Sequence, residues 1–325
     1  MTAMPPIGQG PPDPESVRRA EESVARLEAG GIPLAASERL EAFRRSGTRF
    51  FTSDLTVNEL AATSDLGFRP LTQVMGTCFY RTGWQSYPWG TRAGGWLGAG
   101  GWGTGGRGET FELEQQTDAW NEARRLALAR LAEEARLAGA DAVVGVHLRR
   151  RHHDWAAGLI EFVVVGTAVR SERFRFESDE PALSNLSGQD LAKLVRHGFW
   201  PVGLVAGTTV AYVATGSSQQ WRSTGLLSSM QNQEMPDFTR GIYDARALAM
   251  SRLSRQAHAL HAHGVVGVSI ERSHREIEQD RGGGTRYMDL IIELHVIGTA
   301  IVEVARPDEP PPTYLDLQLN DPERQ

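Results

Sequence analysis

The chain has 325 residues, of which 40% are apolar and 23% charged, and its formal net charge at pH 7 is −6. This length predicts about two globular domains, and the acidic balance argues against nucleic-acid binding over a broad basic surface. Cys78 is the one cysteine, which excludes an intrachain disulfide and zinc sites built from several cysteines. We therefore expect a cytoplasmic protein with Cys78 in the core, no secretory signal and no membrane-spanning segment.

Residues 1–49 predict a segment that is partly helical and partly disordered. A Pro- and Gly-rich start is followed by charged helical patterns over Pro14–Ala29 and Ser37–Arg45. We expect these helices to precede the main domains.

An internal repeat organises the rest of the chain. SDLTVNELA at 53–61 is echoed 131 residues later by SNLSGQDLA, and EARRLALARL from Glu122 is echoed 122 residues later by DARALAMSRL. GTAV at 166–169 returns as GTAI at 298–301. Because these landmarks keep their order, the sequence predicts a duplicated domain.

The first copy, residues 50–171, predicts a short helix, a strand, a long helix and a hairpin. Thr56 and Glu59 have the spacing of a capping box at the start of the short helix. The long helix has apolar residues at spacings of three and four, and Gly139 follows as its stop signal. The other expected elements are a strand over 71–80, the long helix over 117–137 and strands over 142–149 and 160–169.

The second copy, residues 183–305, predicts the same order of elements. Ser187 and Asp190 repeat the cap of the short helix, and Gly264 is the expected stop of the long helix. Apolar and more polar residues alternate along the last strand, which predicts two different faces. The expected strands are 202–213, 265–272 and 288–304, and the Pro-rich tail 306–325 is expected to be disordered.

Two parts of this repeat resemble the YbjQ family, whose members are described as heavy-metal-binding. They are EARRLALARLAEEARLAGADAVVGV from Glu122 and the hairpin ending in GTAV. The second copy departs from the pattern, because His261, Ala262, His263 and Gly264 replace Gly-Ala-Asp-Ala. The resemblance implies an α+β, dodecin-like fold with a long helix across an antiparallel sheet, repeated here in tandem. It also implies a ring-like homo-oligomer and a bound heavy metal.

Histidines are the candidate metal ligands, because zinc, copper and nickel favour imidazole. One cluster lies at the end of the second long helix and the other around the tip of the first hairpin. The alternative is that the former are helix-end histidines favoured by the helix dipole and the latter belong to a solvated polar hairpin. The candidate ligands are His258, His261 and His263 in the first cluster and His147, His152, His153 and Asp154 in the second.

Glu161 and Glu293 occupy equivalent positions inside apolar strands. A carboxylate there is costly unless it is paired or lies at an interface, so both are candidates for a buried polar or ring-lining role. The alternative is that each points to solvent from one face of its sheet.

Residues 83–108 contain eleven glycines and four tryptophans. This composition is typical of a mobile loop whose rings dock on a protein partner, a ring neighbour or a membrane surface; the alternative is an insertion that packs on its own domain. The tryptophans are Trp84, Trp89, Trp96 and Trp102.

No nucleophile elbow, HExxH motif, phosphate-binding lysine or acid/base pair points to catalysis. The basic run from Arg149 to His153 is typical of a hairpin charged for solubility, so we expect no nucleic-acid partner. The sequence therefore predicts a non-enzymatic, oligomeric binding or scaffold protein, with heavy-metal binding implied by the resemblance. The alternative is a protein that docks on a partner or membrane surface through the Gly/Trp-rich loop.

Overall fold

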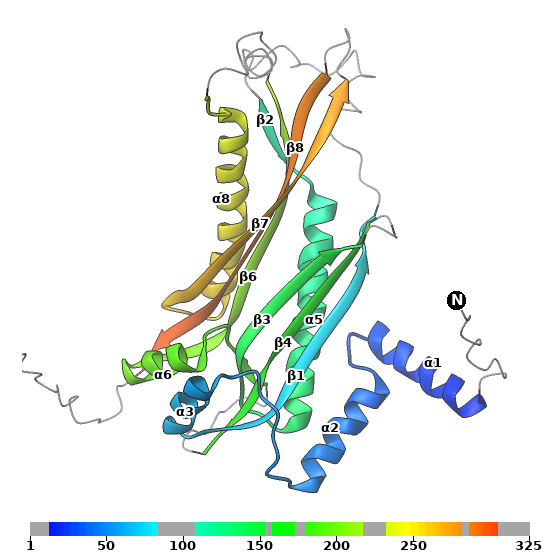
Figure 1. The fold of residues 1–325 in the computed structure, drawn as a ribbon, viewed down its shortest axis with the longest axis vertical. Coiled ribbons are helices and arrows are strands. Elements are labelled where there is room, and N and C mark those ends of the chain that lie inside the picture. The colour runs from blue at the N-terminus through cyan, green and yellow to red at the C-terminus, as the bar shows by residue number, and fades with distance from the viewer. Residues whose placement is uncertain are drawn as a thin grey trace, which may run out of the picture.

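The computed structural model describes residues 13–83, 108–153, 156, 158–172, 180–216, 232–280 and 286–304. These residues form an α+β fold with two four-stranded sheets, and a long helix lies along each sheet (Figure 1). The elements up to the first hairpin are α1 (Pro14–Glu28), α2 (Leu34–Ser46), α3 (Val57–Asp65), β1 (Phe68–Arg81), β2 (Glu109–Glu112), α5 (Glu114–Ala138), β3 (Ala142–His152) and β4 (Leu159–Ser171). The remainder are β5 (Ala182–Leu183), α6 (Gly188–Arg196), β6 (Phe199–Ala214), α8 (Pro236–Ala259), β7 (Gly264–Asp280) and β8 (Arg286–Glu303).

The two copies exchange strands. The first sheet has the order β1-β4-β3-β5, so that β5, at the start of the second copy, pairs in parallel with β3 of the first. The second sheet has the order β2-β6-β8-β7, so that β2 from the first copy pairs antiparallel with β6 of the second. Each copy thus completes the sheet of the other, and the sequence analysis predicted neither β2 nor β5.

Glycines allow each long helix to lie directly on its sheet. A Cβ atom at Gly76 of β1 would meet the carbonyl oxygen of Ala127 in α5 at 1.9 Å. At Gly207 of β6, the equivalent position, it would meet the carbonyl oxygen of Ala249 in α8 at 2.0 Å. No other residue fits this approach, which explains why both copies keep a glycine here.

The helix ends follow the predicted caps with one correction. Thr56 and Glu59 form a complete capping box, and Ser187 accepts a hydrogen bond from the backbone of Asp190. Gly139 ends α5 in the left-handed conformation, at φ 78°. The expected stop at Gly264 is wrong: α8 ends at Ala259, and His261, which replaces Gly139 in the repeat, has the positive φ of 52°. Histidine is among the non-glycine residues that tolerate this conformation best.

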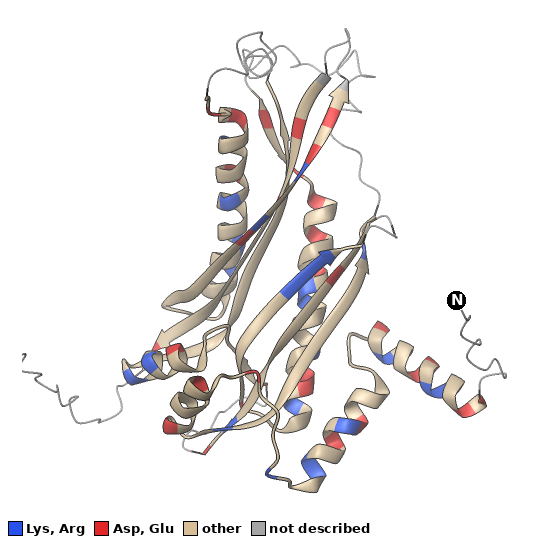
Figure 2. Ribbon diagram, in the orientation of Figure 1, with Lys and Arg blue, Asp and Glu red and all other residues tan. Residues whose placement is uncertain are grey.

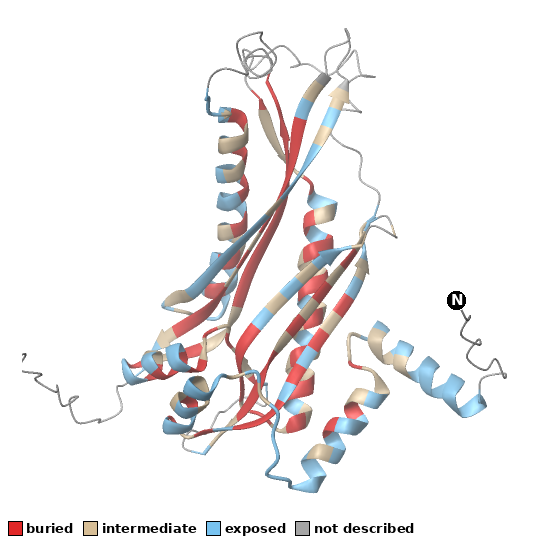
Figure 3. Ribbon diagram, in the orientation of Figure 1, coloured by how far each residue is buried: buried red, intermediate tan, exposed pale blue. Residues whose placement is uncertain are grey.

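The last strand is buried on both faces, which its alternating pattern did not predict. Ile292 and Leu294 face α8, while Ile291 packs into a core that also contains Trp120 and Ala127 of the first copy. Figure 3 shows this buried zone running through both sheets. The core cluster around Trp120 therefore contains residues of both copies.

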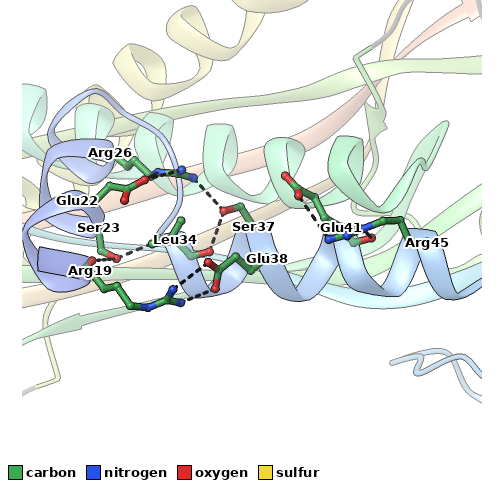
Figure 4. Close-up of polar contacts among 9 residues, drawn as sticks. All are labelled: Arg19, Glu22, Ser23, Arg26, Leu34, Ser37, Glu38, Glu41 and Arg45. Atoms are coloured by element: carbon green, nitrogen blue, oxygen red, sulfur yellow. Dashed lines mark hydrogen bonds and ion pairs between the residues drawn. The ribbon is translucent and has the colours of Figure 1, made fainter. Parts of the chain in front are cut away.

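The N-terminal helices pack beside the first copy only. Leu40 and Ile32 are buried with Ala138 at the end of α5, whereas α1 itself has no buried residue. Ion pairs and hydrogen bonds join α1 to α2, including a two-pronged contact between Arg19 and Glu38 (Figure 4). Helices α1 and α2 thus form an N-terminal helical hairpin that is an addition to the repeated fold.

Candidate functional site

The two copies meet at an extensive interface in the described part of the chain. Residues 182–186, which lead into the second copy, run along the free edge of β3. A bulge at Gly145, with φ 64°, turns two N–H groups of β3 toward this segment. Four backbone hydrogen bonds follow: Ala182 N to Asp141 O (3.0 Å), Ser184 N to Val143 O (2.9 Å), Gly145 N to Leu186 O (3.0 Å) and Val146 N to Ser184 O (2.9 Å).

The short helices continue this interface. Gly188, the first residue of α6, lies against α3, where a Cβ atom would meet the carbonyl oxygen of Glu59 at 2.7 Å. The next turns of α6 bury an apolar cluster that spans both copies. Its members include Leu66 and Val144 of the first copy and Leu186, Leu191 and Val195 of the second.

A buried polar cluster lies at the other side of the interface. Arg124 of α5 is only 6% exposed and donates hydrogen bonds to Thr208 Oγ1 of β6 and to Asn121 Oδ1 (2.7 Å). Burial, together with the charge of Arg252, lowers the pKa of Arg124 to about 10, so the guanidinium is still charged at neutral pH. Arg124 therefore joins the copies as a buried cation held by neutral oxygen acceptors.

His295 of β8 extends the cluster as a neutral ring. Its Nδ1 lies 3.1 Å from Thr208 Oγ1, which can donate its own hydrogen because its oxygen already accepts from Arg124. His295 Nε2 is buried without a hydrogen-bond partner among the described residues. Burial, followed by the charges of Arg150 and Arg124, lowers the pKa of His295 well below its usual value.

Glu293 pairs with a histidine of the other copy. Its two carboxylate oxygens lie 2.8 and 3.0 Å from His152 Nε2, and Ser273 Oγ donates to it at 3.0 Å. Burial alone would raise the pKa of Glu293, but the contacts with His152 and Ser273 lower it on balance. Trp120 stacks edge-on with both His152 and His295, at 5.0 and 5.1 Å between ring centroids.

The predicted carboxylates thus lie in partly or fully buried places. Glu293 is 5% exposed, and Glu161, its counterpart in the first copy, lies 2.9 Å from His153 Nε2. The alternative that both point freely to solvent does not describe them. Whether they line a ring stays a prediction.

The predicted metal ligands come together only in pairs. His152 and His153 each face one glutamate, and His147 lies 4.0 Å from Asp54. His258 lies in the last turn of α8, and His263 Nδ1 accepts a hydrogen bond from the backbone N–H of Glu303. Within the described ranges no three histidine, cysteine, aspartate or glutamate side chains gather as a metal site would require.

Other predicted residues fall outside the described part of the chain. These are Asp154 and the four loop tryptophans, Trp84, Trp89, Trp96 and Trp102.

Two remaining sequence features are placed clearly. Cys78 is buried, and burial raises the pKa of its thiol, so it behaves as a core residue. The basic run on β3 is visible in Figure 2, and its Arg150 lies at the interface, with Nε 3.4 Å from Glu271 of β7. Among the described helices, none combines the length and apolar character needed to span a membrane.

Sequence reasoning missed Arg124, Thr208 and His295. A signal existed for the first two, since Arg246 repeats Arg124 and Thr77 repeats Thr208 at the offsets of the duplication. His295 gave none, because Val163 stands at its equivalent position. Only the arrangement of the two copies shows that these polar residues meet.

Comparison with known proteins agrees with a repeated architecture. Residues 104–172 and 201–304, together more than half of the chain, match the YbjQ family, described as "Putative heavy-metal-binding". The chain is also 38% identical over 247 residues to the Encapsulin nanocompartment protein Rv1762c of Mycobacterium tuberculosis, covering 74% of this chain and 84% of that relative. This chain belongs to the YbjQ family and carries the family fold in two tandem copies.

Proposed function

We propose that the chain is a non-catalytic scaffold protein that assembles with further copies of itself. The observation that supports this is the distribution of exposed apolar side chains. Phe79 on β1 is 55% exposed, whereas Val210, its counterpart on β6, is fully buried against the first copy. Tyr243 on α8 is 67% exposed, whereas its counterpart Asn121 on α5 lies at the interface between the copies.

These exposed residues fall on two different faces. The exposed face around Phe79 in the first copy corresponds to the face of the second copy that packs on the first copy within the chain. The exposed face around Tyr243 in the second copy corresponds to the face of the first copy that packs on the second. Exposed apolar patches of this kind mark interaction sites. Because the two faces differ, association would be head-to-tail and would give a closed ring or an open filament.

The relative from Mycobacterium tuberculosis suggests where such a scaffold would act. It is called a nanocompartment protein, and the alignment covers most of both chains. We infer that this chain too acts in the cytoplasm in a protein-bounded compartment. The polar cluster supports a structural role, because Arg124 bonds to Thr208 and His152 bonds to Glu293, each across the two copies.

Light scattering and native mass spectrometry of the full chain test the proposal. We expect a mass that is a defined multiple of the monomer, together with rings or larger assemblies in electron micrographs. Phe79→Asp should lower the mass, and Val17→Asp on α1 is the matched control that should not. A wild-type chain that is monomeric at all concentrations would contradict the proposal.

Heavy-metal binding is a separate proposal that rests on the family description alone. The described donors for it are the pairs His152–Glu293 and His153–Glu161. Elemental analysis after dialysis against zinc, copper or nickel would test it, and a metal content that is unchanged in His152→Asn with His153→Asn would show that these pairs do not bind the metal.

A further inference from the structure

A pocket lies in the second copy at a place that α6 fills in the first copy. It has a volume of about 410 Å³ and lies between α6 and the start of β7. We call it the receiving site; its lining includes Leu186, Asp190, Lys193, Leu194, Val266 and Gly267. The equivalent place in the first copy, between α3 and β3, is filled by α6, which buries Thr63 and Val144 completely or nearly so.

Building on the proposed self-association, we propose that the receiving site binds residues 51–60 of a second copy of this chain. We call residues 51–57 the leading segment; it ends at Val57, the first residue of α3. By the internal repeat they correspond to residues 182–188, the segment that covers β3 within the chain. The second copy of one chain would thus bind the first copy of the next chain in the way that, within a chain, the first copy binds the second copy. This is addition of a strand to an open sheet edge.

The hydrogen-bonding groups of the receiving site have the required arrangement. Gly267 has φ 62° and lies in a bulge of β7 that matches the bulge at Gly145, with φ 64°. Val268, the counterpart of Val146, is 42% exposed, whereas Val146 is buried beneath the second copy. The matching bonds would run from Phe51 N to His263 O, from Ser53 N to Val265 O, from Gly267 N to Leu55 O and from Val268 N to Ser53 O.

The leading segment already has the shape that its counterpart adopts when docked. The backbone N–H of Asp54 donates to Thr167 Oγ1 at 3.0 Å, and that of Leu55 donates to Ser53 Oγ at 3.0 Å. In the docked counterpart, Asn185 donates to Thr299 Oγ1 at 3.1 Å and Leu186 to Ser184 Oγ at 3.2 Å. Docking therefore requires little further ordering of this segment, which lowers its entropic cost.

The two copies differ in sequence at the residue that would face this pocket. Gly188 fills the interface within the chain so tightly that no side chain fits there. Its counterpart in the leading segment is Val57, which is 82% exposed and brings an isopropyl group. In the proposed complex Val57 would face the receiving site at its apolar residues Leu186, Leu194 and Val266.

A second contact on the same neighbour supports the arrangement independently. Thr77 Oγ1 on β1 is buried without a hydrogen-bond partner among the described residues, although its counterpart Thr208 accepts from Arg124. Arg246 is the counterpart of Arg124 and lies exposed on α8. A chain whose leading segment occupies the receiving site would bring its own Thr77 to this Arg246.

Cysteine cross-linking tests the inference on the full chain. Val143 and Leu183 are paired residues of β3 and β5, so the predicted pair between chains is Val265 and Thr52. We expect Thr52→Cys alone and Val265→Cys alone to give no dimer under mild oxidation, while a mixture of the two gives a disulfide-linked dimer. The pair Val143→Cys with Leu183→Cys is the control for geometry, because its disulfide should form within one chain.

A second variant measures the contribution of the pocket. Val57→Asp should weaken self-association at least tenfold, and Val24→Asp, an exposed position on α1, should leave it unchanged. Assemblies of wild-type mass that give no cross-link in the mixture and tolerate Val57→Asp would overturn this inference and leave the proposed scaffold function in place. A monomeric wild-type chain would overturn both.

Discussion

Strands β3 and β7 have the same sequence motif and opposite surroundings. Both contain Val-Val-Gly-Val, both form a bulge at the glycine, and each pairs with the last strand of its copy. The motif is buried in β3 and largely uncovered in β7, as Figure 3 shows. The difference comes from residues 182–186, which cover the edge of β3 only. The sequence of a strand therefore sets its bulge and pairing, while its burial depends on what binds next to it.

The largest expected effect comes from placing a charge on each of these two edges. Val144 is buried beneath the second copy, so Val144→Asp should lower the free energy of unfolding by about 3–5 kcal/mol, because it places a charge in an apolar cluster. Val266→Asp should change that free energy by less than about 1 kcal/mol, because Val266 is partly exposed. Urea unfolding at low protein concentration measures both.

For the mass of the assembly, we expect the larger effect from Val266→Asp rather than from Val144→Asp. Val266→Asp should lower the mass of the assembly, because a charge then lies in the receiving site. Equal destabilisation by the two substitutions in dilute solution would show that the edges of β3 and β7 are covered alike.

A second comparison concerns the two equivalent threonines. Thr208→Val should cost about 1–3 kcal/mol of unfolding free energy, because Arg124 and His295 then lose a buried hydrogen-bond partner. Thr77→Val removes a buried hydroxyl that has no partner in the described residues, so it should be neutral or slightly stabilising in the isolated chain.

In self-association, by contrast, we expect Thr77→Val to be unfavourable. If Arg246 of a neighbour donates to Thr77, Thr77→Val weakens self-association while it leaves the monomer intact. Thermal unfolding and light scattering on the same samples separate the two effects, and a Thr77→Val chain that is as destabilised as Thr208→Val would contradict the difference between the copies.

Much of each copy could be predicted from its sequence, because local patterns determine those elements. Apolar spacing located α5, and the Thr56 and Ser187 caps located α3 and α6. The strands β2 and β5 were missed because they are only four and two residues long and pair with the other copy. Short strands of this kind have no periodicity of their own.

The candidate site was less predictable for a related reason. Asp289, Glu293 and His295 read as the polar face of a half-exposed strand, which is the usual meaning of a two-residue period. In the fold that face packs on the first copy, so these groups are buried and meet partners far away in sequence. The period indicates which residues share a face but not what covers it.

His295 of the second copy makes the free energy of unfolding depend on pH, and the first copy has valine at the equivalent position. Its pKa is lowered in the fold, so below the ordinary histidine value of about 6.5 the unfolded chain binds a proton that the folded chain does not. The contribution to stability is complete above about pH 6.5 and falls by up to about 1.4 kcal/mol per pH unit below it. His295→Val, which introduces the residue of the first copy, should remove this part of the slope between pH 7 and 5.5.

Urea unfolding of both proteins across that range provides the measurement. Identical slopes for wild type and His295→Val would show that His295 is protonated in the folded chain, against the burial and the positive neighbours that surround it.

The smallest and most local effect concerns the N-terminal hairpin, which only the first copy carries. Arg130 of α5 donates to the carbonyl oxygens of Leu27 (3.1 Å) and Gly31 (3.0 Å), whereas its counterpart Arg252 pairs with Glu112 of β2. The N-terminal helical hairpin thus lies beside β1 at the position that corresponds to that of β2 beside β6.

Replacing Arg130 should therefore release the hairpin without unfolding the sheets. We expect Arg130→Ala to increase the rate of proteolytic cleavage between residues 14 and 46 several-fold, because two charge-assisted hydrogen bonds to the hairpin are lost. Arg19→Ala should leave the rate unchanged, since the Arg19–Glu38 pair is exposed and joins α1 to α2 rather than to the core. Equal protection in both variants would mean that the buried contact of Leu40 and Ile32 with Ala138 is enough to hold the hairpin in place.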